Sequence, residues 1–139
     1  MRILHISDTH NQHRLLHDLP AADLIIHVCC AKCKHSGDFT FSGAGKEVVD
    51  FVDWFGGLDY RILITHRPPY GILDSRKNIS YGCPDLLLAV LLKVTPRYHL
   101  FGHVHDAYGI QKVGATTFVN ASVLNDAYQL TNEPVVLEV

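Results

Sequence analysis

The sequence has little net charge, no long apolar run and no regular cysteine pattern, and each shortage excludes a class of protein. Its 139 residues carry a formal net charge of −2 with histidine neutral. An extended nucleic-acid surface and a general attraction to anionic membranes are therefore not expected. The longest apolar stretch, Leu86–Leu92, is too short to span a bilayer. No signal-peptide pattern stands before the first strand-like segment, so a cytoplasmic protein is expected.

The four cysteines do not suggest a disulfide framework, because Cys29, Cys30 and Cys33 are crowded together and Cys83 is remote. Cys30-Ala-Lys-Cys33 followed by His35 has half of the spacing of a zinc site, but no second pair lies at a suitable distance. A zinc or redox element and a reduced surface loop are both open interpretations. We favour the surface loop.

Segments typical of strands and helices alternate, and a run of strands follows them. Strands are expected over 2–7, 23–28, 61–65, 98–101, 108–113, 116–121 and 134–139, and helices over 12–19, 46–55 and 84–94. This order predicts an α/β fold. A hydrophobic content of 47% is enough for a core at this length, so residues 1–139 are expected to form a single domain.

Polar residues stand where four of these apolar segments end. The clusters are Asp8-Thr-His10, Gly37-Asp38, Thr65-His66 and Gly102-His-Val-His105. Loops at the carboxyl ends of strands in an open α/β sheet gather at one place, so the clusters are expected to converge. Alternate residues of a strand share a face, so the paired side chains in Asp-x-His and His-x-His are expected to point together. Asp-x-His and Gly-Asp alone are more often a loop or turn, Thr-His alone says nothing, and Gly-His-x-His alone favours neither interpretation. The ordered set of four favours a metal site.

The order Asp-x-His, Gly-Asp, His, Gly-His-x-His resembles the signature of the calcineurin-like metallophosphoesterases. Residues 64–74, 81–84 and 101–105 look like a small phosphodiesterase branch of that family. The resemblance implies a β-sandwich flanked by helices, here shortened in the middle. It also implies two divalent ions, and carboxylate and imidazole ligands suit Mn, Fe or Zn.

The resemblance assigns six residues to the two ions: Asp8, His10 and His105 to the first, His66 and His103 to the second, and Asp38 as the bridge between them. It implies catalytic roles for Asp38 and His66, which would position a metal-bridging hydroxide for attack on phosphorus. Arg67, beside His66, is expected either to bind the substrate phosphate or to pair with a carboxylate.

The chain departs from this family in two places. It has no Gly-Asn-His motif, whose Asn would complete the second metal site and whose His would assist the leaving group. It also has an apparent insert, Val28–His35. The strand before the insert either stops early, so that the insert loops outward, or continues into the cysteines and displaces Asp38.

The function expected from the resemblance is hydrolysis of phosphomonoesters or phosphodiesters, with cyclic nucleotides among the small substrates it implies. The alternative is a metal-binding remnant of the family with weakened or no activity. Because a sheet segment next to Tyr60-Arg61 is missing, an exposed strand edge is expected to be covered in a homodimer.

Overall fold

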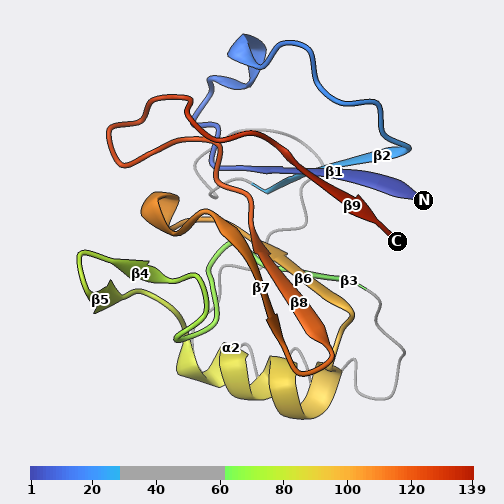
Figure 1. Cartoon of the computed structure of the whole chain (residues 1–139). Coiled ribbons are helices and arrows are strands. Elements are labelled where there is room, and N and C mark those ends of the chain that lie inside the picture. Colours follow the sequence, from blue (N-terminus) through green and yellow to red (C-terminus); the bar gives the residue numbers. More distant parts are fainter. Residues whose placement is uncertain (29–61) are drawn as a thin grey trace.

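The protein is described here from a computed structural model, which describes residues 1–28 and 62–139. Among these residues a three-stranded sheet, a four-stranded sheet and a helix are stacked in three layers, with the three-stranded sheet uppermost in Figure 1 and the helix below. A separate two-stranded sheet completes the described strands. The α/β class expected from the sequence is confirmed. Asp38, the expected helix over 46–55 and the insert beyond Val28 lie outside the described residues.

The first sheet has β1 (Arg2–Ser7) between β2 (Leu24–Val28) and β9 (Val135–Glu138). β1 pairs with β2 in parallel and with β9 in the antiparallel direction. All residues of β1 after the first are buried, as expected for a central strand covered on both faces.

The second sheet has the order β3 (Ile62–Ile64), β6 (Tyr98–Phe101), β8 (Thr116–Asn120) and β7 (Gly109–Val113). β3, β6 and β8 run parallel, and β7 returns antiparallel to β8. Gly114, with φ of 59°, forms the turn between β7 and β8, a conformation that glycine adopts without the steric penalty of a side chain.

The expected helix over 84–94 is confirmed in position but changes geometry along its length. It begins as α2 (Pro84–Ala89) and continues as a π-helical turn over Val90–Val94. The amide of Thr95 donates to the carbonyl of Val90 across 2.9 Å, the wider bond that defines a π turn. Pro84 stands at the start of α2, where no amide donor is needed.

One local expectation was wrong, and one local element was not predicted. The helix expected over 12–19 is only a 3-10 turn, His13–Leu15, followed by extended backbone at Leu16. A short hairpin that the sequence did not suggest, β4 (Ser75–Arg76) with β5 (Ile79–Ser80), lies between β3 and α2. The described residues contain no helix with the length and apolar character needed to cross a membrane.

The described residues contain three buried core clusters, and two of them lie in the spaces between the three layers. Between the sheets, Ile3 belongs to a buried cluster with Leu100 and Val119. Between the second sheet and α2, Phe101 packs in a cluster with Leu86. The neighbouring residues Leu100 and Phe101 thus face opposite layers, as the two-residue period of a strand requires. This packing holds the carboxyl ends of β1, β3 and β6 at one edge of the molecule.

Candidate metal centre

Main-chain hydrogen bonds join the residue after β6 to a residue after β3, and the end of β1 to the residue after β8. The amide of Gly102, directly after β6, donates to the carbonyl of His66 across 3.1 Å. The amide of Ser7, at the end of β1, donates to the carbonyl of Ala121 across 2.9 Å. These bonds bring Asp8 into the same region as the histidines that follow β3 and β6.

Asp8, His10 and His105 form a cluster in which one possible ligand atom from each residue lies within 4.8 Å of the others. Nε2 of His10 lies 3.3 Å from Nε2 of His105. Two imidazole nitrogens bound to one tetrahedral ion, at bond lengths of about 2.0–2.1 Å, stand roughly 3.3 Å apart. The spacing therefore fits two ligands of a single ion.

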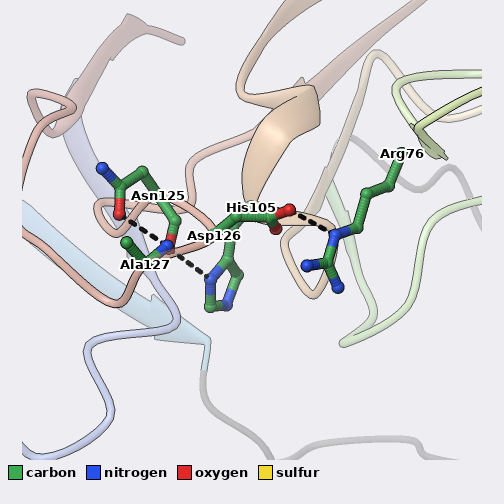
Figure 2. Close-up of polar contacts among 5 residues, drawn as sticks. All are labelled: Arg76, His105, Asn125, Asp126 and Ala127. Carbon is green, nitrogen blue, oxygen red and sulfur yellow. Dashed lines mark hydrogen bonds and ion pairs between the residues drawn. The ribbon is translucent and has the colours of Figure 1, made fainter.

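A hydrogen bond at Nδ1, the ring nitrogen that does not face His10, fixes the orientation of the His105 ring. Nδ1 of His105 lies 3.0 Å from the carbonyl oxygen of Asn125, and Figure 2 shows this contact. A carbonyl only accepts, so Nδ1 carries the proton and the neutral ring has its lone pair on Nε2. This is the outer hydrogen bond that commonly orients a metal-binding histidine.

Asp8 is held rigidly in the interior, with only 2% of its surface exposed. Its Oδ2 accepts from the main-chain amide of His103 at 2.7 Å and from the hydroxyl of Ser7 at 2.9 Å. Gly102 packs against the same carboxylate, and a Cβ at that position would lie 2.0 Å from Oδ2 of Asp8. The glycine of the Gly-His-x-His motif is thus required by the close approach of Asp8.

A second pair of nitrogens lies next to the first cluster. Nδ1 of His103 is 3.2 Å from Nε2 of His66, again a separation that suits two ligands of one ion. Nδ1 of His66 is buried and has no hydrogen-bond partner among the described residues. A buried polar atom without a partner is unfavourable, so Nδ1 of His66 is still able to accept or donate a hydrogen bond or to bind a ligand.

Burial lowers the pKa of three histidines of the centre, His10, His66 and His103, and so favours their neutral form. It lowers the pKa of His10, with proximity to His105 lowering it further and Asp8 opposing the change. Burial also lowers the pKa of His66. For His103 burial is again the main cause, followed by the neighbouring His66, and the pKa falls to about 4. Neutral imidazole is the form that binds metals, so the environment favours ligation at neutral pH.

The backbone of the centre differs from the expected extended geometry. Asp8, His10 and His103 have φ values of 53°, 43° and 72°, in the left-handed region that residues with side chains rarely adopt. The paired side chains therefore do not converge by simple alternation along a strand. Tight left-handed turns aim them instead, and such strain is frequent at functional sites.

Five of the six predicted ligands are therefore brought together, and Asp38 lies outside the described residues. Arg67 is exposed, and its charge contributes to the lowered pKa values of His66 and His103. The hydroxyl of Thr65 donates to the main-chain carbonyl of Arg67 across 2.7 Å. This bond holds the backbone of Arg67.

A cavity of about 220 Å³ opens beside His103 and His105, and its lining includes Arg76, Asp126 and Tyr128. Sequence reasoning missed these last three residues. The ring of Tyr128 stands edge-on to His105, with centroids 5.3 Å apart. The turn that carries Asp126 and Tyr128 had a local signal in Asn125, whose side chain accepts from the amides of the residues two and four positions later.

Comparison with known proteins finds similarity over part of the chain. The sequence is 49% identical over 84 residues to metallophosphoesterase domain-containing protein 1 of Homo sapiens, a match that covers 59% of this chain and 25% of the relative. It is 45% identical over 78 residues to a UPF0046 protein of Caenorhabditis elegans, covering 56% of this chain and 27% of the relative. The matches thus span about a quarter of these relatives' length. No family model matches the chain.

Proposed function

We propose, from this confirmed resemblance to the calcineurin-like metallophosphoesterases, that the chain is a metal-dependent phosphoesterase acting on small phosphomonoesters or phosphodiesters. The observation that carries the proposal is the cluster of Asp8, His10 and His105, whose ligand atoms lie within 4.8 Å of one another beside a cavity. A carboxylate with two imidazoles is a donor set for a divalent transition metal.

The described residues fit two ions. Asp8, His10 and His105 would hold the first, and His66 with His103 would hold the second. Asp38 stays the predicted bridge between them and, with His66, the predicted catalytic residue. When bound, such ions supply Lewis acidity to the phosphoryl oxygens and to a water nucleophile. Mn, Fe and Zn all suit these ligands.

The chain's own contribution is to hold these groups in place before substrate arrives. The amide of His103 and the hydroxyl of Ser7 fix the Asp8 carboxylate, and the Asn125 carbonyl fixes the His105 ring. Groups fixed in advance need no reorganisation during the reaction. The cavity beside them is large enough for a phosphoryl group and part of its ester substituent. Cyclic nucleotides are among the substrates we propose, in a cytoplasmic setting.

The proposal is tested by measuring metal content and hydrolysis of bis(p-nitrophenyl) phosphate with added Mn²⁺. His105→Ala removes a proposed ligand, and we expect it to lower both bound metal and turnover, the latter by about 100-fold or more. His17→Ala is the matched control, since His17 is exposed and lies outside the cluster. Equal turnover in the two variants would place the chemistry elsewhere.

A second candidate function is metal binding with little turnover. The observation that favours it is the absence of the Gly-Asn-His motif, because loss of a general acid lowers rates by about 10²- to 10⁴-fold. The two candidates separate on one result. Metal bound in proportion to protein, with no metal-dependent hydrolysis of an activated aryl diester, would favour the binding protein over the enzyme.

A further inference from the structure

One charged pair in the cavity beside the metal centre has no role in the function proposed so far. Arg76 comes from β4 and Asp126 from the loop between β8 and β9, and both line the cavity together with His103 and His105. Nε of Arg76 donates to Oδ2 of Asp126. Figure 2 shows this bond alongside the neighbouring His105.

The contact to Asp126 leaves most of the arginine's hydrogen-bonding capacity unassigned. A guanidinium carries five N–H donors, and the contact drawn in Figure 2 uses only the one on Nε. The Arg76 side chain is 42% exposed and that of Asp126 is 25% exposed. The guanidinium of Arg76 is therefore oriented by Asp126 through Nε, while the side chain stays partly exposed and lines the cavity.

The segment that carries Arg76 is braced by a buried carboxylate. Asp74 is only 3% exposed, and its Oδ2 accepts from the amides of Gly71 and Gly82 at 2.9 and 3.0 Å and also from the hydroxyl of Ser80. These bonds close the loop on both sides of the β4–β5 hairpin. The main chain that carries Arg76 is thus held in place. A residue that recognises a ligand needs such rigid support, whereas a surface ion pair does not.

We propose that Arg76 is the substrate-binding arginine of this site, that it binds phosphoryl oxygens of the substrate through its terminal nitrogens, and that Asp126 is the positioning residue that sets the plane of its guanidinium. A planar fork held beside a site for phosphoesters matches the geometry of phosphate oxygens. Arg67, the residue expected from the sequence, is not among the residues that line this cavity. The inference rests on the proposed function and adds the residue that recognises the substrate.

The ion pair could instead serve the fold alone, because exposed pairs of this kind contribute only about 0–1 kcal/mol and occur widely. Arg2 and Glu138 form such a pair, with Nε and Oε1 3.6 Å apart, on β1 and β9. Arg2 does not line the cavity. Arg2→Gln is therefore the matched control for Arg76→Gln.

The experiment measures the affinity of the Mn²⁺-loaded protein for inorganic phosphate by calorimetry, together with Mn²⁺ affinity and the KM and kcat for bis(p-nitrophenyl) phosphate. We expect Arg76→Gln to weaken phosphate binding at least tenfold and to raise KM, with Mn²⁺ affinity unchanged. Arg2→Gln should leave all four quantities within twofold of the wild type. Arg76→Lys keeps the charge without the fork and should lie between them.

Asp126→Asn tests the positioning role. We expect it to weaken phosphate binding less than Arg76→Gln does, and to have little further effect when both changes are combined, because Asp126 acts only through Arg76. Additive effects would contradict this role. Unchanged phosphate affinity in folded Arg76→Gln would overturn the inference and leave the pair as a purely structural contact.

The outcomes separate this inference from the proposed function. Phosphate binding that depends on Arg76, in a wild-type protein without hydrolytic activity, would overturn the proposed function and keep the recognition role of Arg76. Metal-dependent hydrolysis with a KM that Arg76→Gln does not change would keep the proposed function and overturn the recognition role of Arg76. A wild-type protein that binds Mn²⁺ but neither binds phosphate nor hydrolyses the diester would overturn both.

Discussion

The α-carbon of Gly102 packs so closely against the carboxylate of Asp8 that a Cβ at position 102 would lie 2.0 Å from Oδ2 and 2.2 Å from the hydroxyl of Ser7. Asp8 belongs to the strand end of one sheet and Gly102 to that of the other. Their contact therefore sets the distance between the two parts of the metal centre.

The first prediction follows from this contact. Gly102→Ala must push the Asp8 carboxylate away from its donors, and we expect metal affinity to fall by about 10- to 100-fold, the range for loss of a group that orients a ligand. Gly114→Ala is the control, since a Cβ there meets nothing within 4 Å, although its φ is positive. Calorimetric titration with Mn²⁺ measures the effect, and equal affinities in the two variants would contradict it.

The second prediction concerns the relative strength of the two metal sites. The first has Asp8, His10 and His105 clustered within one ligand sphere, whereas the second has His66 and His103 among the described residues and lacks the Asn of Gly-Asn-His. We expect the second ion to bind more weakly and to leave first during stepwise chelation, followed by elemental analysis. His66→Ala should then remove one ion and keep the other. Release of both ions in one step would count against this order.

The third prediction uses a buried histidine outside the centre. Burial, and to a smaller degree the neighbouring His5, lowers the pKa of His99 to about 3. At pH values between about 3 and the ordinary pKa of 6.5, His99 binds a proton in the unfolded chain but not in the folded chain. The free energy of unfolding is therefore fully retained above pH 6.5 and falls by about 1.4 kcal/mol for each pH unit below it, until the pH reaches the folded pKa.

Urea denaturation of the metal-free protein at pH 7 and pH 5 measures this dependence. His99→Gln removes the titrating group and should flatten the pH dependence relative to the wild type, whatever its effect on stability at pH 7. His17→Gln changes an exposed histidine and should leave the slope as it is in the wild type. A slope that His99→Gln does not alter would show that His99 is already accessible to protons in the folded state.

The fourth prediction concerns the homodimer, which the sequence placed at an edge next to Tyr60-Arg61 and which we here place at β2. Among the described residues β2 pairs only with β1, and Leu24 and Ile25 on it are 44% and 55% exposed. An edge strand with exposed apolar side chains tends to pair with another chain. We expect sedimentation to show a dimer that Ile25→Lys dissociates and that Leu92→Lys, on the exposed end of the helix, does not. A monomeric wild type at high concentration would exclude this association.

The sequence predicted that polar residues after β1, β3 and β6 lie close together, because each follows an apolar run that forms a strand. These strand ends belong to two different sheets, so their approach depends on how the sheets pack. The pairing of Arg76 with Asp126 was not predictable in the same way, since the two residues are 50 positions apart and neither belongs to a recognisable motif. The helix expected over 12–19 failed for a related reason. Leu16 packs against the cluster that contains Leu4 and Ile6, and this tertiary contact outweighs a weak local helical preference.

The left-handed backbone at Asp8, His10 and His103 has a consequence for attempts to rebuild this centre in another protein. Placing Asp-x-His and Gly-His-x-His at the ends of two regular strands would reproduce the sequence motifs but not the convergence of their side chains, because the left-handed turns at these three residues direct the side chains toward one another. A transplant has to carry the main-chain path of both loops, together with the glycine that lets the sheets approach and the Asn125 carbonyl that orients His105. The transferable unit is therefore a pair of shaped loops, and the ligand residues alone are not enough to define it.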